Sequence, residues 1–485
     1  MKSDKLQNAI GMIDEDLILR AEEKPNKKVP KFIWKWSAAI AAVLVFAIGF
    51  PILFGNTTPA MQDKFGNTTL AMQVKALCEA EYPKMAQYPN ENSLNFSSSF
   101  DAWSADRRER RSYIGEGSLS EEYLRATATK ILGDAGAENL VYSPLNIYMA
   151  LAMLAEITDG ESRAQILSLL GETDVKTLRK NANALWNANY SNDGAVTSIL
   201  ASSLWLNEDV SFRQNTLNTL AESYYASSYQ GEMGTDAMNK ALQNWLNEQT
   251  GGLLKDQIEG IETTPETILA LATTIYFKAK WAEEFSEGLT EKDIFHSANG
   301  DVTTDFMKQT LFYGNYYWGE NYSATYKELE GSGKMWFILP DEGISIDELL
   351  ASDAVLDLMA NGKYENKKSI RINLSVPKFD VSSKIDLAEK MQALGITDCF
   401  DMKKADFSPL LTEDMPAYLS SAEHGARVAI DEEGVTAAAY TVMMAAGAAI
   451  PPENEVDFIL DRPFLFVITG MDGSPLFMGV VNSVS

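Results

Sequence analysis

The sequence predicts an α+β fold in one large domain, preceded by a single transmembrane helix. Three observations lead to this prediction. Beyond residue 119, helical and strand periodicities follow one another without a Pro/Gly-rich linker. An uncharged apolar run lies near the N-terminus, and a strongly apolar hairpin with a turn at Asp472 and Gly473 lies near the C-terminus.

The overall composition excludes several classes of protein. The 485 residues carry 41 Lys and Arg against 68 Asp and Glu, a net charge of −27, so we expect no nucleic-acid partner. Cys78 and Cys399 are too few for a disulfide framework or a zinc site of thiolates. Neither His296 nor His424 lies in a nucleophile motif. We therefore expect no catalytic residues, no metal and no cofactor.

The first element is the apolar run at residues 37–54, which just reaches the roughly 18 residues needed to span a bilayer. Four lysines precede it, at positions 27, 28, 31 and 35, together with Trp34 and Trp36. By the positive-inside rule, residues 1–36 would form a cytoplasmic tail and the domain would lie outside the cell. The alternative is a cleaved signal peptide, but the leading segment is long and no persuasive cleavage site follows.

A polar spacer and a basic cluster come next. Residues 55–74 contain most of a tandem duplication, FGNTTPAMQ and FGNTTLAMQ, which is too short for a repeat fold. The large domain is predicted over residues 75–485. Near its start, Arg107, Arg108, Arg110 and Arg111 could bind a polyanion, although a solvated helix face is the simpler interpretation.

Within the domain, apolar spacings of three and four residues predict helices at 147–155, 240–249 and 384–394. Runs of β-branched and aromatic residues predict strands at 270–278, 335–339, 370–376 and 464–469. The segment 331–334 (GSGK) lacks most of a phosphate-binding loop, and we interpret it as a surface turn.

One segment fits neither a helix nor an ordinary core strand. Residues 434–452 (GVTAAAYTVMMAAGAAIPP) contain no charge and follow Asp431, Glu432 and Glu433. Alanine content alone would favour a helix, and the run is poor in large aliphatic residues for a membrane span. A strand that can enter a sheet requires uncharged side chains at every position, which this segment provides.

The chain resembles the serpin family at this segment and through much of the domain. IDEEGVTAAAY is similar to the hinge of the serpin reactive loop, and AIPPE is similar to its distal end. Further matches are YSPLNI at 142–147, NW and TGG at 244–252, IYFK to Trp281, VPKF at 376–379, LGI at 394–396, and RPF with SPLFMG at 462–479. The resemblance covers residues 75–485 and identifies a bacterial, membrane-anchored member.

The resemblance implies a fold of three β-sheets with eight or nine helices and an exposed reactive-centre loop. It also implies a serine protease inhibitor that acts as a suicide substrate. The target protease cleaves the loop and forms an acyl-enzyme, and the cut loop then inserts into the central sheet and distorts the protease before it can deacylate. The expected partner is a serine protease in a covalent complex, and we expect a monomer.

Family register assigns the site residues one by one. The reactive bond falls between Ala448 and Ala449, and the preceding residues Ala445, Ala446 and Gly447 suit the shallow pockets of elastase-like or subtilisin-like proteases better than trypsin. A shifted register that uses Met444 is the alternative. The hinge comprises Glu432, Glu433, Gly434, Val435, Thr436, Ala437, Ala438 and Ala439.

The gate, through which the loop would enter the sheet, comprises Ser143, Asn146, Thr273 and His424, and Trp281 marks the point where insertion begins. Asn146 stands where a serine is common in the family, and Thr273 where asparagine is common, so we expect altered hydrogen bonding in the gate. His424 is predicted to have a buried, noncatalytic role. Three alternatives stay open: a cysteine protease inhibitor, a non-inhibitory serpin and an enzyme.

Overall fold

The computed structural model describes residues 40–49, 74–89, 93, 95–331, 333–435 and 454–484, which form two nine-stranded sheets with helices around them. The central sheet has its strands in the order β13-β14-β1-β7-β5-β6-β2, with β15 on β7 and β4 on β5. Its members are β1 (Ile40–Gly49), β2 (Lys75–Cys78), β4 (Ser191–Asn192), β5 (Thr197–Asn207), β6 (Ala226–Gly231), β7 (Thr267–Lys280), β13 (Phe379–Asp386), β14 (Tyr418–Ile430) and β15 (Gly434–Val435). All pairs are antiparallel except β5 with β6.

The second sheet has the order β16-β12-β9-β10-β11-β17-β18-β3, with β8 on β9. Its members are β3 (Leu140–Tyr142), β8 (Glu291–Ser297), β9 (Gly300–Gly319), β10 (Tyr322–Leu329), β11 (Gly333–Pro340), β12 (Asn366–Pro377), β16 (Glu455–Ile459), β17 (Phe464–Thr469) and β18 (Pro475–Val481). Three sheets were expected. The described residues instead form two continuous hydrogen-bonded sheets, because the 20-residue β9 pairs with β8, β10 and β12 and so joins these strands into one sheet.

Eleven α-helices lie in the described part of the chain, where eight or nine were expected, and eight of them have nine or more residues. They are α3 (Phe96–Arg110), α4 (Glu121–Leu132), α5 (Pro144–Ile157), α6 (Gly160–Leu170), α7 (Val175–Asn189), α8 (Gln214–Tyr224), α9 (Asp236–Gln249) and α12 (Asp353–Asn361). Shorter helical turns are η2 (Arg111–Tyr113), α10 (Lys255–Ile258), η3 (Glu287–Leu289), α11 (Ile346–Leu350), α13 (Ala388–Ala393) and η4 (Asp398–Phe400).

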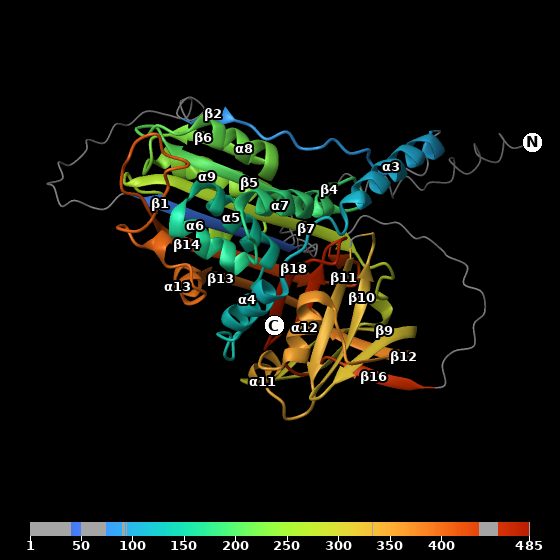
Figure 1. The fold of residues 1–485 in the computed structure, drawn as a ribbon. Coiled ribbons are helices and arrows are strands. Elements are labelled where there is room, and N and C mark those ends of the chain that lie inside the picture. The colour runs from blue at the N-terminus through green and yellow to red at the C-terminus, as the bar shows by residue number, and fades with distance from the viewer. Residues whose placement is uncertain are drawn as a thin grey trace, which may run out of the picture. The chain divides into compact units, whose positions relative to one another are not determined.

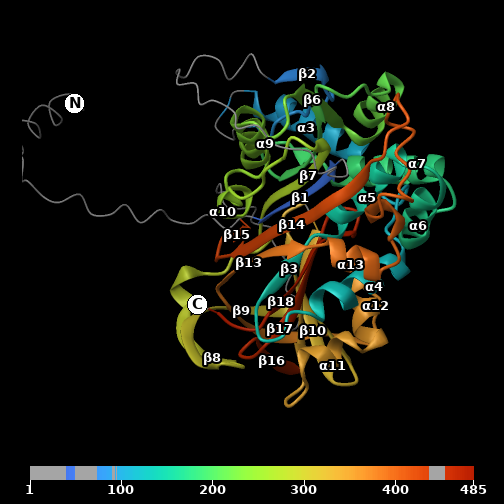
Figure 2. The same cartoon turned by 90° about the vertical axis from the view of Figure 1, so that its left-hand side faces the viewer.

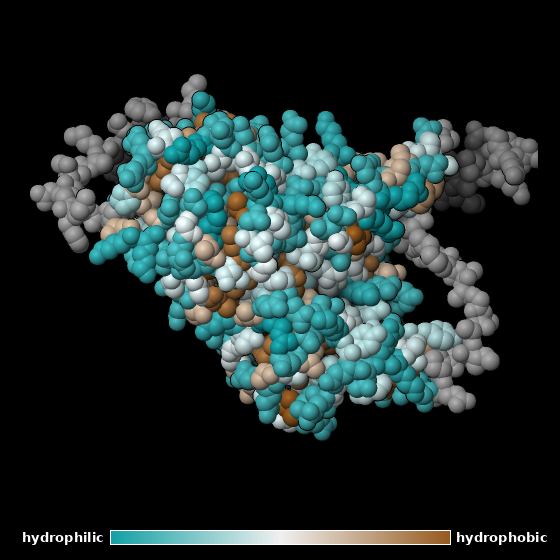
Figure 3. All heavy atoms as spheres, viewed as in Figure 1, coloured by the Kyte–Doolittle hydropathy of each residue, from teal (hydrophilic) through white to brown (hydrophobic). Residues whose placement is uncertain are grey.

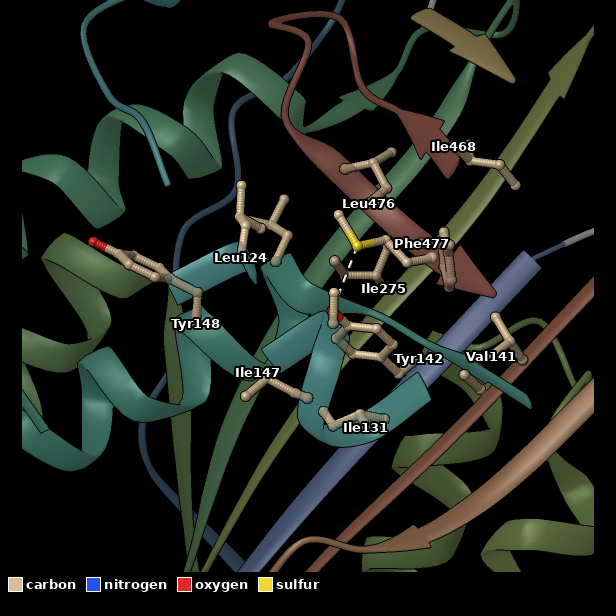
Figure 4. Close-up of a cluster of buried hydrophobic side chains, with 14 of the residues drawn as sticks. Leu124, Ile131, Val141, Tyr142, Ile147, Tyr148, Ile275, Ile468, Leu476 and Phe477 are labelled. Carbon is tan, nitrogen blue, oxygen red and sulfur yellow. Dashed lines mark hydrogen bonds between the residues drawn. The ribbon is translucent and has the colours of Figure 1, made fainter. Parts of the chain in front are cut away.

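Helix α5 is the centre of the core, and all of its residues are buried. The Ser143 hydroxyl accepts a hydrogen bond from the Asn146 amide at 3.2 Å and caps the helix, and Pro144 occupies its first turn. Figure 4 shows Ile147 and Tyr148 of α5 near Leu124 and Ile131 of α4 and near the C-terminal hairpin. The N-terminus of this helix carries two of the predicted gate residues, Ser143 and Asn146.

Most elements predicted from the sequence are confirmed. The helices predicted at 147–155 and 240–249 lie within α5 and α9. The one at 384–394 is confirmed in part, because β13 continues to Asp386 and α13 spans only Ala388–Ala393. The predicted strands lie in β7, β11, β12 and β17, and the C-terminal hairpin is β17 with β18. The surface turn predicted at 331–334 is confirmed only in part, because Gly331 lies in the β10–β11 turn whereas Gly333 and Lys334 begin β11.

The predicted transmembrane helix at residues 37–54, and with it the anchored, extracellular location, is wrong. Residues Ile40–Gly49 form strand β1 between β14 and β7, as Figures 1 and 2 show. No helix among the described residues is long and apolar enough to cross a bilayer. An uninterrupted apolar run is equally typical of a strand covered on both faces, and the β-branched residues Ile40, Val43, Val45 and Ile48 favour the strand.

The basic cluster divides between a solvated and a packed part. Arg108 and Arg111 are exposed, as a solvated helix face requires, and the chain's visible surface in Figure 3 is mostly hydrophilic. Arg107 instead stacks on Trp103 at 4.8 Å from the ring centroid and donates a hydrogen bond to the Gly331 carbonyl at 2.7 Å. Arg107 thus joins α3 to the β10–β11 turn.

Candidate functional site: the hinge, the gate and the filled sheet position

The proximal end of the uncharged segment is fixed to the end of β7. Gly434 and Val435 form β15, opposite Lys280 and Ala279 of β7. The Trp281 indole nitrogen donates a hydrogen bond to the Asp431 carbonyl at 2.9 Å, and the Trp281 amide donates to the Glu433 carbonyl at 3.3 Å. The predicted insertion point and the predicted hinge are therefore in direct contact.

The Glu432 carboxylate also fixes the hinge, through contacts with Thr290 and Lys378. Its Oε1 atom accepts a hydrogen bond from the Thr290 hydroxyl at 2.7 Å and lies 2.7 Å from the Lys378 ammonium. Burial raises the pKa of Glu432, but the bonds from Lys378 and Thr290 outweigh it and lower the pKa below its usual value. The Glu432 carbonyl also accepts from the Phe285 amide at 2.9 Å.

Among the described hinge residues, Gly434 is the one whose position requires glycine. Its φ is +133°, a conformation that other residues rarely adopt. A Cβ atom there would lie 2.5 Å from the Trp281 amide nitrogen and 2.6 Å from the Lys280 Cα. Glycine thus allows the backbone to approach the end of β7 closely enough to pair with it.

The four predicted gate residues lie together at the N-terminus of α5. His424 is fully buried on β14, and its Nε2 atom accepts a hydrogen bond from the Ser143 amide at 3.0 Å. The Asn146 side-chain amide donates to the Thr273 carbonyl at 3.3 Å, so α5 is bonded to both β14 and β7. The acceptor role of Nε2 places the ring proton of a neutral His424 on Nδ1. That this bonding differs from the gate bonding common in the family stays a prediction for Asn146 and Thr273.

The space between β7 and β14, below the gate, is filled by β1. Leu44 of β1 lies opposite Thr273 on one side and His424 on the other. Leu44 is fully buried in the core that includes α5, whereas Val45 is buried in the cluster on the other side with Trp205. Residues 40–49 of the chain itself thus fill the sheet position between β7 and β14, the strands that carry Thr273 and His424.

Lys327 is a buried ammonium group that the sequence does not reveal. It lies on β10 beside the insertion point, 4.2 Å from the Phe285 ring centroid and 5.4 Å from that of Trp281. The Nζ atom donates to the Glu283 carbonyl at 2.8 Å and to the Gln309 side chain. Burial lowers the pKa of Lys327 to about 7. A lysine in a strand is ordinarily exposed, so no sequence signal distinguishes it.

Several predicted site residues lie outside the described residues. They are Thr436, Ala437, Ala438 and Ala439 of the hinge, Ala445, Ala446 and Gly447 before the reactive bond, and Ala448 and Ala449 at the bond itself. Glu432, Glu433, Gly434 and Val435 are described and carry the contacts given above, except that only the backbone of Val435 is described. The described residues contain no group of three or more His, Cys, Asp or Glu that could hold a metal ion.

The two cysteines are both free thiols. Cys78 is partly exposed on β2, whereas Cys399 is buried. Burial raises the pKa of Cys399 to about 12, so this thiol is protonated at neutral pH. Neither residue contributes to the hinge or the gate.

Comparison with known proteins places this arrangement in a family. A family model described as Serpin (serine protease inhibitor) matches residues 125–484. Serpin-ZX of Arabidopsis thaliana is 28% identical over 364 residues, which cover 71% of this chain and 91% of that protein. Alpha-1-antitrypsin of Meriones unguiculatus is 28% identical over 355 residues, which cover 71% and 84%. A serpin-like protein of the archaeon Methanosarcina mazei is also 28% identical. That this chain is bacterial stays a prediction.

Solved structures agree on the fold. The native-state structure of the thermophilic serpin tengpin superposes with a TM-score of 0.67 at 24% identity and covers 85% of this chain and 100% of that one. The Arabidopsis serpin AtSerpin1 gives a TM-score of 0.63 at 23% identity and covers 77% and 98%. Serpins are in general serine protease inhibitors rather than enzymes. The chain belongs to the serpin family.

Proposed function

We propose that this serpin inhibits serine proteases as a suicide substrate, through cleavage of its reactive-centre loop. The protease serine oxygen attacks the Ala448 carbonyl carbon, the bond to Ala449 breaks, and the Ala449 nitrogen leaves with a proton as a free amine. The products are an ester between the protease and Ala448 and a new N-terminus at Ala449. Water would normally hydrolyse the ester, and insertion of the loop into the central sheet prevents this step.

The observation that carries the proposal is strand β15. The first two residues after the Glu433 carbonyl, Gly434 and Val435, already pair with β7 in the antiparallel sense. Residues 436–448 are uncharged, so their side chains can enter a sheet that is covered on both faces without burying a charge. A loop that starts in register can extend along β7 by adding one residue pair after another, once the edge of β7 that β1 now occupies is free.

The target class follows from the residues before the bond. Ala445, Ala446, Gly447 and Ala448 present small side chains, which fit shallow pockets. Trypsin recognises a cation at the position of Ala448 through an acidic pocket, and this loop offers none. We therefore infer an elastase-like or subtilisin-like target, and we further propose that the inhibitor is a monomer.

A panel of proteases tests the proposal. The full chain is incubated with pancreatic-type elastase, subtilisin, trypsin and papain, and the products are separated on a denaturing gel. A complex that survives denaturation with elastase or subtilisin, together with a released peptide that begins at Ala449, is the expected result. Cleavage at that bond without a stable complex would contradict inhibition by trapping. A stable complex with papain alone would assign the chain to the cysteine protease inhibitors.

A non-inhibitory serpin is the second candidate, and β1 is the observation that favours it. The sheet position that an inserted loop would take is occupied by residues 40–49. If β1 never leaves this position, the loop is an ordinary substrate and the fold serves another purpose. The same gel distinguishes the two candidates, because only an inhibitor retains the protease.

A further inference from the structure

Strand β1 is an internal strand of the central sheet, paired along both of its edges. Its ten residues are antiparallel to β14 on one side and to β7 on the other. Helix α5 lies against β1 on one face of the sheet, where Leu44 is buried. On the other face, Val45 is buried with Met238 and Leu242 of α9. The segment is thus fully integrated into the folded protein.

The hinge strand β15 and β1 run along the same edge of β7 in the same direction. Gly434 and Val435 lie opposite Lys280 and Ala279, and β1 begins opposite Phe277, two positions further on. If the β15 register continues by one residue at a time, residues 437–445 come to lie opposite the β7 positions that residues 40–48 now occupy. Two strands cannot occupy one position, so each excludes the other.

The two segments are similar in chemistry. Residues 40–48 read IAAVLVFAI and residues 437–445 read AAAYTVMMA, and neither contains a charge. Both therefore meet the condition for a strand whose two faces are covered by helices and core side chains.

They differ at the gate. In the continued register Thr441 takes the place of Leu44, opposite Thr273. The Thr273 hydroxyl is buried and has no hydrogen-bond partner among the described residues. Directly opposed threonines in an antiparallel pair can bond through their hydroxyls, so Thr441 supplies a partner that Leu44 lacks. The loop can thus offer the buried Thr273 hydroxyl a hydrogen bond that β1 cannot.

We propose that β1 is a built-in occupant of the loop-acceptor position and that it must leave this position before the inhibitor can trap a protease. This inference rests on the proposed inhibitory function, and it adds a regulatory role for the N-terminal segment. While β1 is in place, the cleaved loop cannot insert, and the acyl-enzyme has time to hydrolyse. When β1 withdraws, the loop takes its place and the protease is held. The ratio of trapped protease to escaped protease is therefore set by how readily residues 40–49 leave the sheet.

A reversible cross-link in the full chain tests the proposal. Ala47 lies opposite Ala270 of β7, and paired positions in adjacent antiparallel strands are within reach of a disulfide. The double variant Ala47→Cys/Ala270→Cys is oxidised, the bond is located by peptide mass spectrometry, and complex formation with elastase is compared before and after reduction. Ala41→Cys/Ala270→Cys is the matched control, because Ala41 lies opposite Tyr276, about 20 Å from Ala270 along β7.

We expect the first pair to cross-link and the control pair not to. The oxidised form should be cleaved at the reactive bond with at least a tenfold loss of stable complex, and reduction should restore the wild-type yield. Failure of the first pair to cross-link, or equal cross-linking of the control, would overturn the position of β1. A cross-linked form that traps as well as the reduced form would overturn the regulatory role. If neither form nor the wild-type chain traps any protease, the proposed function fails and the regulatory role with it, whereas the cross-link still reports where β1 lies.

Discussion

Val435 and Ile40 pair with the same edge of β7, opposite Ala279 and Phe277, and only the position of Lys278 separates them. The reactive-loop hinge and the N-terminal strand β1 therefore lie end to end along one edge of β7. Because both run antiparallel to β7, growth of either one along this edge requires the other to recede.

The substitution Ala437→Arg should convert the inhibitor into a substrate. Our proposal places Ala437 opposite Phe277 within the sheet after cleavage, in the continued register, and outside the sheet before cleavage. An exposed arginine changes the free energy of unfolding by no more than about 0.5 kcal/mol, but a buried, unpaired one costs several kcal/mol. About 1.4 kcal/mol on the insertion barrier slows insertion tenfold.

A denaturing gel and a protease activity assay measure this effect. The variant should be cut at the same bond and should release active protease, and the control Ala437→Ser should trap like the wild type. Unchanged trapping by the arginine variant would show that this residue does not enter the sheet.

The substitution Ala448→Arg should redirect the loop towards trypsin. An arginine before the bond provides the cation that the trypsin pocket recognises and that the shallow pocket of elastase rejects. The measurement is the second-order rate of complex formation with each protease. The control Ala446→Arg places the same charge two residues earlier and should not create trypsin specificity. If the control were as effective, the assigned reactive bond would be out of register.

The substitution Gly434→Ala should destabilise the protein by about 1–3 kcal/mol through backbone strain, and by more where the Cβ meets β7. The new Cβ would lie 2.5 Å from the Trp281 amide nitrogen, so β15 must move away. Denaturant unfolding gives the change in free energy. Gly473→Ala is the matched control, since Gly473 also has a positive φ but no atom lies within 4 Å of its added Cβ. Equal losses of unfolding free energy in the two variants would mean that the close approach of Gly434 to β7 contributes nothing to stability.

The substitution Thr441→Val should weaken trapping without weakening the uncleaved protein. It removes the hydroxyl that we expect to bond to Thr273, and a net hydrogen bond contributes about 1 kcal/mol. The resulting change of about fivefold in the balance between trapping and release is read from the stoichiometry of inhibition. Thr436→Val makes the same change at a position opposite Lys278 and should have little effect. The prediction fails if the two variants trap equally well.

Lys327 should make stability depend on pH between neutrality and about pH 10. In the unfolded chain a lysine keeps its proton to about pH 10.4, whereas burial lowers the pKa of Lys327 in the folded chain to about 7. Between these values the unfolded state binds more protons, so the free energy of unfolding rises with pH, by up to about 5 kcal/mol. Below pH 7 the full penalty of burying the charge is present.

Unfolding of Lys327→Met across this pH range measures the contribution. The slope of stability against pH should fall in this variant and should be unchanged in Lys367→Met, where the lysine is exposed. Identical slopes in wild type and Lys327→Met would show that Lys327 is charged in the folded protein.

The sequence predicts most of the fold well because it depends on local signals. The Ser143 cap followed by Pro144 marks the start of α5, and His424 lies in a segment that matches the family. The same reasoning fails for residues 37–54, because a continuous apolar run satisfies a bilayer and a doubly covered sheet equally. Only the partners of the run, β7 and β14, distinguish the two, and they lie more than two hundred residues away in sequence.

The contacts of the hinge were also beyond prediction. Glu432 is recognisable from the family pattern, but its partners Lys378 and Thr290 come from separate elements and carry no pattern of their own. Lys327 is similar, since its burial depends on Glu283, Phe285 and Gln309 meeting around it. Long-range packing decides these contacts, and periodicity along the chain does not report it.

Hydrogen exchange before and after cleavage tests the central claim, that the reactive loop takes the sheet position that β1 fills. The full chain is cleaved by elastase, and the exchange of backbone amides is followed by mass spectrometry in residues 40–49 and 437–445. Paired amides inside a sheet exchange slowly, and released ones exchange fast. The account predicts that cleavage makes residues 40–49 exchange faster and residues 437–445 exchange more slowly. Continued protection of residues 40–49, with fast exchange in the cleaved loop, would contradict it.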